Sequence, residues 1–295
     1  MNALVLSLTA ILSLFPYFLF GLVLFFLGKF LFDISTPHIE DDKELTERDN
    51  PAFGVFFVGY MLGLAFALAG SFFGLGSNVL ANFVNIGTSG IAAIILLRLS
   101  MFIADKLILY TFKIEKEIVQ DRNVGTGFAV GGVFVSSGLI IEGVMTGQSS
   151  SYLAMLRDIL IYWAVGQAFL VIGALLFQLV ARYDVHRTIG EEDNMAAGIS
   201  LGGYLVALGI ILKAALTGAG SDLGGELVVT MVVGIAGLVI LMFARFLAEV
   251  VLLPRANLAD EVSRQKNIAA GAVSAVGYIA IAVLFSGVVV NQLQQ

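Results

Sequence analysis

Two arginines lie inside long apolar segments of this sequence, where a charged side chain is a common sign of function. Arg98 is in the segment 79–105, and Arg245 is in the segment 226–252, four residues before Glu249. A guanidinium in such a segment can extend to the polar membrane surface or pair with a carboxylate one helical turn away. It can also bind an anion or a lipid headgroup. We interpret both arginines first as snorkelling or paired side chains, and an anion or headgroup site is the alternative.

A second set of polar residues stands directly before apolar segments. Asp and Asn side chains accept hydrogen bonds from the free N–H groups at a helix start, and a carboxylate favours the positive end of the helix dipole. We therefore predict that these residues cap four helices. The alternative is that the asparagines surround a central axis and line a vestibule for a ligand. The set comprises Asp49, Asn50, Asn123, Asp193, Asn194 and Asn267.

Residues that commonly perform catalysis or bind metals are scarce. The chain has no cysteine, and its two histidines, His38 and His186, lie in charged stretches. No Asp or Glu lies in the middle of an apolar segment. The motifs of serine hydrolases, zinc proteases, P-loop proteins and dinucleotide-binding proteins are absent from the sequence. We therefore expect no enzymatic activity, no metal site and no cofactor.

The elements that must position these residues are membrane helices. Hydrophobic residues make up 59% of the 295 residues and charged residues only 13%, whereas soluble domains are roughly 45–50% apolar and about 25% charged. A spanning helix needs about 20 mainly apolar residues. We predict an all-α bundle embedded in the lipid bilayer. Eight segments are long enough: 4–32, 52–73, 79–105, 124–142, 153–181, 195–217, 226–252 and 267–290.

The loops between these segments alternate between longer, charged loops and short loops rich in Gly, Ser and Thr. Most Lys and Arg residues lie in the charged loops 33–50, 106–123, 182–194 and 253–266. Because cytoplasmic loops carry an excess of Lys and Arg, we predict that the charged loops are cytoplasmic and that both termini are periplasmic. The first charged loop is also acidic, with Glu40, Asp41 and Asp42 in a row. The net charge of −6 and the lack of a basic stripe argue against a nucleic-acid partner.

The sequence repeats itself at an offset of 144 residues. Over residues 47–78 and 191–222, 12 of 32 positions are identical without gaps. Polar matches continue farther along the chain at the same offset. We predict a tandem duplication of a four-helix unit, with the two units at 1–144 and 145–295. A unit with an even number of spans leaves the membrane on the face it entered, so the two units should be parallel repeats.

The repeat also marks glycine and tyrosine positions within the helices. The pairs Gly59-Tyr60 and Gly203-Tyr204 match at the repeat offset, and small residues recur near them at a spacing of four. This spacing lets two helices approach closely in lipid. We predict tight helix packing at the glycines and a hydrogen-bond partner on a neighbouring helix for each tyrosine hydroxyl. A ligand or ion path along these faces is the alternative.

The first repeat resembles a known family of bacterial inner-membrane proteins, the domain-of-unknown-function 350 family. The resemblance lies in TPHIEDDKELTERDNPAFGVFFVGY, with TPH at 36–38, the asparagine at Asn50 and the pair Gly59-Tyr60. The second copy lacks TPH. The resemblance implies a multi-pass protein of the bacterial inner membrane, built here from two fused family units. It implies no activity, because the biochemistry of the family is not established.

These observations support two hypotheses about function. The first is a non-enzymatic membrane component that packs through small-residue faces, forms homo-oligomers and presents its acidic loops to a cytoplasmic protein. The second is a channel or uniporter for a small anion or solute, with a path at the repeat interface and with Arg98 and Arg245 attracting the anion. A third, weaker hypothesis is a lipid-handling enzyme that uses Arg98 as a headgroup anchor.

Overall fold

The computed structural model describes residues 3–147, 151–217, 222–252 and 257–293, and these residues form helices and connecting turns without a β-strand. Six short helices separate or extend the long ones: η1 (Lys43–Glu47), η2 (Ala104–Ile108), η3 (Lys116–Gln120), α6 (Val185–Gly190), η4 (Ala248–Leu252) and α9 (Leu258–Ser263). The long helices are α1 (Ala3–Ser35), α2 (Pro51–Gly70), α3 (Val79–Ile103), α4 (Val124–Met145), α5 (Tyr152–Ala181), α7 (Met195–Leu216), α8 (Leu223–Leu247) and α10 (Ile268–Leu293).

Seven of the described helices are long and apolar enough to cross a membrane. They correspond to seven of the eight predicted segments. The eighth, α3, is 25 residues long but is not among the seven. Its first half carries several Asn, Thr and Ser residues. The fold class is thus all-α with several membrane-spanning helices, as the composition predicts.

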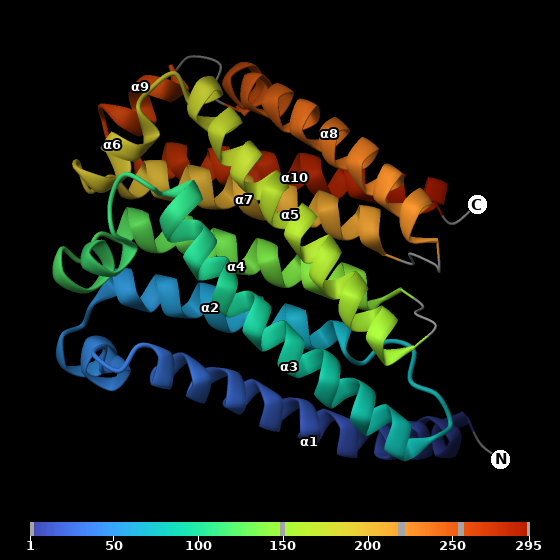
Figure 1. The fold of residues 1–295 in the computed structure, drawn as a ribbon. Coiled ribbons are helices and arrows are strands. Elements are labelled where there is room, and N and C mark those ends of the chain that lie inside the picture. The colour runs from blue at the N-terminus through green and yellow to red at the C-terminus, as the bar shows by residue number, and fades with distance from the viewer. Residues whose placement is uncertain (1–2, 148–150, 218–221, 253–256, 294–295) are drawn as a thin grey trace.

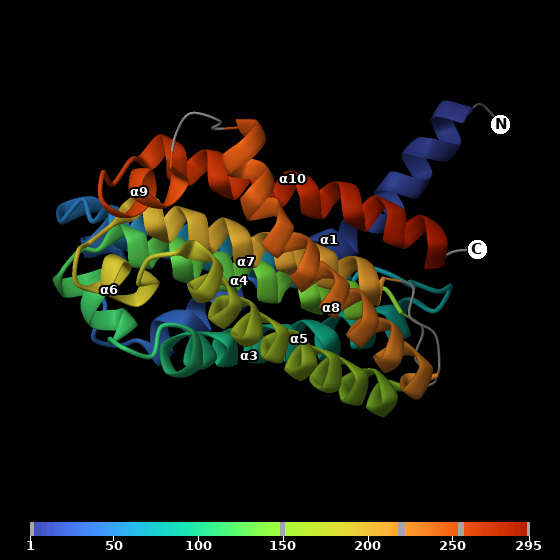
Figure 2. The ribbon, with the colours of Figure 1, turned by 90° about the horizontal axis from the view of Figure 1, so that it is seen from above.

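The long helices form two layers (Figures 1 and 2). The inner layer is a row in which α2 packs on α4, α4 on α7, and α7 on α10. The outer layer consists of α1, α3, α5 and α8. Three outer helices each pack on two inner helices: α3 on α2 and α4, α5 on α4 and α7, and α8 on α7 and α10. The charged loops lie together at one end of the bundle, and both termini lie near the other end (Figure 1).

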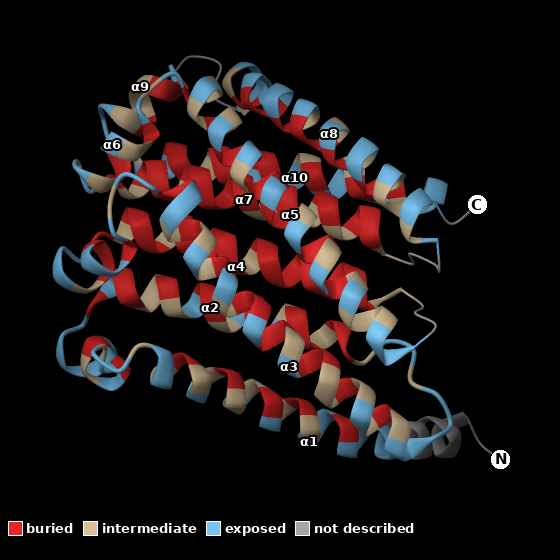
Figure 3. Cartoon of the chain, viewed as in Figure 1, coloured by how far each residue is buried: buried red, intermediate tan, exposed pale blue. Residues whose placement is uncertain are grey.

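Glycine brings the inner helices together. A methyl group added at Gly59 would lie less than 3.0 Å from the backbone of α4, and one at Gly132 would lie equally close to α7. At Gly203 it would meet Ala275 of α10 at a similarly short distance. Close backbone approach of this kind is how helices associate in lipid, where the hydrophobic effect gives little driving force between helices. Figure 3 shows the result: α4 and α7, in the middle of the row, are mostly buried, and the outer helices are exposed on the side away from the row.

The structure contains a shorter repeat than the predicted unit of 144 residues. The capping asparagines Asn50, Asn123, Asn194 and Asn267 follow one another at intervals of 73, 71 and 73 residues. In each case the asparagine N–H donates to the carbonyl of the sixth residue before it. Each asparagine also follows a residue with a positive φ between 46° and 54°. The fold is therefore four consecutive two-helix hairpins, which we number 1 to 4, with an outer and an inner helix in each.

Candidate functional site

Each of the four asparagines caps an inner helix. The Oδ1 atom of Asn50 accepts from the N–H groups of Ala52 and Phe53 at 3.1 and 3.2 Å. Asn123, Asn194 and Asn267 each accept from the N–H group three residues ahead, at 3.0–3.2 Å. An asparagine carbonyl satisfies donors that have no partner within the helix itself. The predicted caps are thus the asparagines and not the aspartates.

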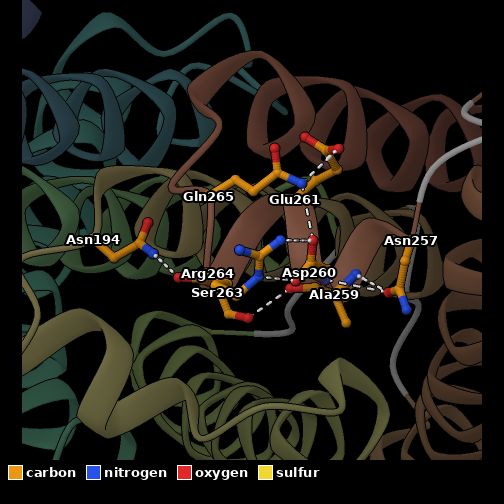
Figure 4. A network of polar contacts seen from close by, with 8 residues as sticks. All are labelled: Asn194, Asn257, Ala259, Asp260, Glu261, Ser263, Arg264 and Gln265. Carbon is orange, nitrogen blue, oxygen red and sulfur yellow. Dashed lines mark hydrogen bonds and ion pairs between the residues drawn. The ribbon is translucent and has the colours of Figure 1, made fainter.

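The side-chain amide of each cap also joins one hairpin to the next. The Nδ2 atom of Asn50 donates to the Ile118 carbonyl at 2.9 Å, and Asn123 donates to Ile189 at 2.6 Å. Asn194 donates to the carbonyls of Val262 and Ser263 at 2.8 and 3.1 Å, and Figure 4 shows its contact with Ser263. These bonds fix the short helix of each following hairpin against the inner helix before it. Residue spacing alone does not reveal this second role of the caps.

Asp49 and Asp193 have a backbone role instead of a capping one. Both residues are in the left-handed region, with φ of 46° and 49°, and the other two hairpins have Arg122 and Lys266 at this place. Asp is one of the few residues with a side chain that adopts this conformation readily. The turn reverses the chain between the short helix and the asparagine cap. The repeated Asp-Asn pair is therefore a turn followed by a cap.

Arg98 lies over an aromatic ring and does not pair with an acid. Its guanidinium carbon is 4.8 Å from the centre of the Phe32 ring, a cation–π contact between α3 and α1. Asp105, the acid that follows it in the sequence, accepts from Ile114 N at 3.1 Å and pairs with Lys106 at 2.6 Å. The Nη1 atom of Arg98 is buried and has no hydrogen-bond partner in the described part of the chain.

Arg245 is buried and paired, as the i, i+4 spacing suggests. Its Nε atom is 3.7 Å from an oxygen of Glu249, and its Nη2 atom donates to the Ala181 carbonyl at 3.1 Å. The second oxygen of Glu249 is 3.6 Å from Nη1 of Arg182. Burial raises the pKa of the nearby Tyr183 hydroxyl above its usual range. Two nitrogens of Arg245, Nε and Nη1, lack a hydrogen-bond partner among the described residues.

The structure does not bring the two arginines together. Arg98 is on α3 and Arg245 is on α8, and α5 packs between these two outer helices (Figure 1). Each arginine lies at the charged end of its own helix. They are two separate sites and do not face a common axis.

The repeat tyrosines differ in their hydrogen bonding. Tyr60 donates to the carbonyl of Gly28 on α1 at 2.9 Å. Tyr204 is buried, but its hydroxyl has no hydrogen-bond partner within the described ranges. Each ring packs in an aromatic group, with Phe32 and Phe134 around Tyr60. Tyr60 has the predicted partner on a neighbouring helix, whereas Tyr204 does not.

An ion cluster at the charged end of α1 was not predicted. Lys29 lies 2.6 Å from Asp33 and 3.4 Å from Asp41. Asp41 is buried, so it cannot contact a partner protein as the sequence suggests for the acidic loop. Burial and the adjacent Asp33 carboxylate raise the pKa of Asp41 to about 6. The i, i+4 spacing of Lys29 and Asp33 was visible in the sequence, but the return of Asp41 onto them was not.

A second unpredicted ion pair joins the two repeats near the opposite end. Lys213 of α7 lies 2.7 Å from Glu142 of α4. The fourth apolar segment was predicted to end at Glu142, whereas α4 continues to Met145. Both residues are thus within their helices and face one another across the glycine contact.

A polar cleft of about 700 Å³ opens at the charged end, between the loops of hairpins 2 and 3. Tyr110 and Phe112 contribute aromatic surface, and the Nε2 atom of His186 is hydrogen-bonded to the Ile108 carbonyl at 2.8 Å. Burial raises the pKa of Glu117, and hydrogen bonding to Asp121 raises that of Lys116. In the described residues no group of His, Cys, Asp and Glu is arranged to hold a metal. The charged lining residues are Lys116, Glu117, Asp121, Asp184, Arg187, Glu191 and Asp193.

Comparison with known proteins agrees with this architecture. The family model described as Domain of Unknown Function (DUF350) matches residues 5–145 and again residues 151–289. The chain belongs to the DUF350 family. Each DUF350 match covers two of the four hairpins, so the family unit is itself a pair of hairpins.

A curated relative matches this chain over nearly the whole length of both proteins. The chain is 26% identical over 270 residues to a UPF0719 transmembrane protein of Aquifex aeolicus (strain VF5). The aligned region covers 90% of this chain and 96% of the relative. No solved structure matches this DUF350 protein. The relative supports a multi-pass membrane protein, and its description names no activity.

Proposed function

We propose that this DUF350 protein is a non-enzymatic component of the bacterial inner membrane that binds a cytoplasmic protein partner. The observation that carries the proposal is the polar cleft at the charged end of the bundle, where the two family units meet. The cleft contains aromatic side chains, which are enriched in protein interfaces, and charges of both signs, which a partner of complementary charge can recognise. Partner binding there involves the loops of both repeats at once.

The proposal includes a topology of eight spans. With 25 residues, α3 is about 37 Å long at about 1.5 Å per residue, which is enough to cross the hydrocarbon core. Eight spans place the two repeats in parallel, with the cleft in the cytoplasm and both termini in the periplasm, as the Lys and Arg distribution predicts.

Labelling of single cysteines tests this topology, since the chain has no cysteine of its own. In intact cells, a membrane-impermeant thiol reagent should label Leu153→Cys, which is exposed at the other end of the bundle, and should spare Glu47→Cys. Labelling of both, or of Glu47→Cys alone, contradicts the topology.

Photocrosslinking tests the partner site. A photoreactive amino acid at the exposed Tyr110 should give an adduct of one defined mass in native membranes, and the same group at Leu153 should not. The charge reversals Lys116→Glu and Arg187→Glu should reduce the adduct, because both side chains line the cleft. Adducts that are equal at both positions, or unaffected by the reversals, argue against a partner at this cleft.

A channel or uniporter for a small anion is the second candidate. Buried guanidinium nitrogens without hydrogen-bond partners, on Arg98 and Arg245 in the described structure, support it because they could bind an anion. Chloride flux into proteoliposomes should then exceed that of empty vesicles and should fall in Arg98→Ala. Flux at the level of empty vesicles rejects this candidate.

A further inference from the structure

The row of inner helices ends at α2 on one side and at α10 on the other, and in the described structure no further helix of the chain continues it (Figure 1). Since the four hairpins repeat, positions in the inner helices can be compared by counting from each capping asparagine. The comparison identifies residues at both ends whose equivalents are all buried between hairpins. We call these ends the α2 edge (Gly54, Val58 and Ala65) and the α10 edge (Ala269, Val276, Ala280 and Gly287).

Gly54 lacks the neighbour that explains each equivalent glycine. The fourth residue after the cap is Gly127, Gly198 or Gly271 in the other hairpins. A methyl group at any of these three would lie less than 3.0 Å from the backbone carbonyl of the preceding inner helix. At Gly54 the nearest atom of another residue is the Leu45 side chain, at 3.9 Å.

Gly287 has the same property at the other end of the row. Its equivalents, twenty residues after the cap, include Gly70 and Gly143, where a methyl group would lie 2.9 Å from atoms of the next inner helix. Gly287 has nothing within 4 Å among the described residues. Both terminal helices thus carry a glycine at a position where the equivalent glycines contact a neighbouring inner helix. Among the described residues no such helix lies beside Gly54 or Gly287.

The exposed apolar residues follow the same pattern. The seventeenth residue after the cap is Ala67, Ile140 or Ile211 in the first three hairpins, and each is fully buried. Ile140 and Ile211 contact the outer helix of the following hairpin, at Gly166 and Gly237. The equivalent residue of α10, Leu284, is 73% exposed because no fifth outer helix follows.

The polar contacts between hairpins also stop at both ends. Each asparagine amide donates to the carbonyl of the residue five positions before the next cap, and these residues, Ile118, Ile189 and Val262, are buried. Their equivalent in hairpin 1 is Leu45, which is 37% exposed. Asn267 donates to Glu261 of its own hairpin, and no following carbonyl is present for it within the described chain.

The first outer helix, α1, also lacks one of the neighbours that the other outer helices have. The other outer helices each pack on their own inner helix and on the preceding one. In the described structure α1 packs on one inner helix, α2, and on the outer helix α3. The place of the preceding inner helix beside α1 is open. An α10 helix of another molecule would occupy it.

From these contacts we infer that a second copy of this chain continues the row, with the α10 edge of one copy packed on the α2 edge of the next. Asn267 then donates to the Leu45 carbonyl of the neighbour, and Leu284 packs on its α1. The inference does not depend on the partner site at the cleft. The contact is heterologous, so it builds either a closed ring or an open row. Val58 and Val276 are larger than the glycines at these positions inside the chain, so the two helices lie farther apart at this contact than at the internal ones.

Disulfide crosslinking tests the interface. Inside the chain the ninth residue after one cap meets the eighth after the next, in the pairs Gly59 and Gly131, Gly132 and Gly202, and Gly203 and Ala275. The corresponding residues across copies are Val276 and Val58, which are 63% and 55% exposed.

In native membranes treated with copper phenanthroline, the variant Val58→Cys/Val276→Cys should give a ladder of covalent dimers and larger species. Each single variant should stay monomeric. The pair Val58→Cys/Leu175→Cys is the matched control, because Leu175 is exposed on α5 and lies several residues from the charged end, as Val58 does. A double variant that stays monomeric, or a control that crosslinks equally, overturns the proposal.

Substitution of Gly54, which contacts no neighbouring inner helix in the described structure, gives a second measurement. Gly54→Leu should fold normally, because no backbone is near it, and it should abolish the crosslinking of Val58→Cys/Val276→Cys. Size-exclusion chromatography of Gly54→Leu in detergent should give the monodisperse profile of the parent. Crosslinking that persists in a well-folded Gly54→Leu protein contradicts the proposed interface.

Discussion

At the scale of single residues, the capping asparagines show how one side chain stabilises two levels of structure. The oxygen of Asn123 caps α4, and its nitrogen donates to Ile189 of the next hairpin and to Glu117 of its own. An ionised carboxylate has no donor, and an aliphatic side chain has neither a donor nor an acceptor, so neither can replace the amide here. The amide therefore couples helix initiation to hairpin stacking.

Replacing Asn123 tests this double role. We expect Asn123→Ala to lower the free energy of unfolding by roughly 2–4 kcal/mol, because it removes a cap and leaves the buried Ile189 carbonyl without its donor. Asn78→Ala is the control, since Asn78 caps α3 through one exposed bond to Ala81. It should cost about 1 kcal/mol. Equal losses in thermal unfolding in detergent would argue that the amide bond to Ile189 adds nothing.

The buried carboxyl of Asp41 predicts a dependence of stability on pH. Its pKa is raised to about 6 in the folded protein, so the folded state holds the proton more tightly than the unfolded state. The contribution of Asp41 to the free energy of unfolding should therefore be largest below about pH 4, and it should decrease as the pH rises from about 4 to 6. Lys29 and Asp33 are the charged groups that face it.

We expect Asp41→Asn to flatten this part of the melting-temperature profile, because asparagine does not titrate. Asp42→Asn, at the exposed neighbouring position, should keep the parent profile. A profile of Asp41→Asn that falls as steeply as the parent between pH 4 and 6 would assign the dependence to another group.

At the scale of helices, the inner row depends on glycine at specific contacts and not on glycine in general. Gly132 is close to the backbone of α7, whereas Gly87 on α3 has only the Phe20 ring at 3.5 Å. A methyl group must therefore displace a whole helix at the first position and makes ordinary contact at the second. Glycine is therefore required by a close backbone contact at Gly132, and no such contact requires it at Gly87.

The pair Gly132→Ala and Gly87→Ala tests this difference. Gly132→Ala should destabilise the protein by about 1–3 kcal/mol, the usual cost of overpacking. Gly87→Ala should be neutral or stabilising by up to about 1 kcal/mol, because alanine favours a helix more than glycine does. Unfolding in a denaturant series measures both. The explanation fails if the two variants have the same stability.

At the scale of the whole molecule, the boundary between the two family units resembles the contacts inside them. The helices α4 and α7 meet through the same glycine positions as α2 and α4, and the Glu142–Lys213 ion pair is added near the end of the contact. The two DUF350 units therefore form one continuous row of hairpins. We therefore expect this contact to form without the covalent link between the two units.

Co-expression of the two halves tests this view. Chains 1–147 and 148–295 should copurify from membranes, since the α4–α7 contact is as extensive as the contacts within each half. Glu142→Lys should reduce copurification by placing two positive charges together, and adding Lys213→Glu in the other half should restore it. A charge swap that does not restore copurification would show that the ion pair has no part in the assembly.

The membrane-embedded helices, the glycine faces and the capping positions could be predicted from the order of the amino acids. These features are local, because a span needs only a sufficient apolar length and a cap needs only the residues around a helix start. The repeat of 144 residues was also visible, because matched polar residues stand out against an apolar background. The shorter hairpin repeat was not, since few residues besides the asparagines recur in all four hairpins.

Which residues contact one another could not be predicted in the same way, because it depends on how the helices pack. The structure placed Arg98 against Phe32 and Arg245 against the Ala181 carbonyl in two separate sites, and it folded Asp41 onto Lys29. It also left Gly54 and Gly287 without neighbours at opposite ends of the row. Contacts between distant segments depend on how helices stack and how loops return, and the periodicity of one helix carries no information about its neighbour.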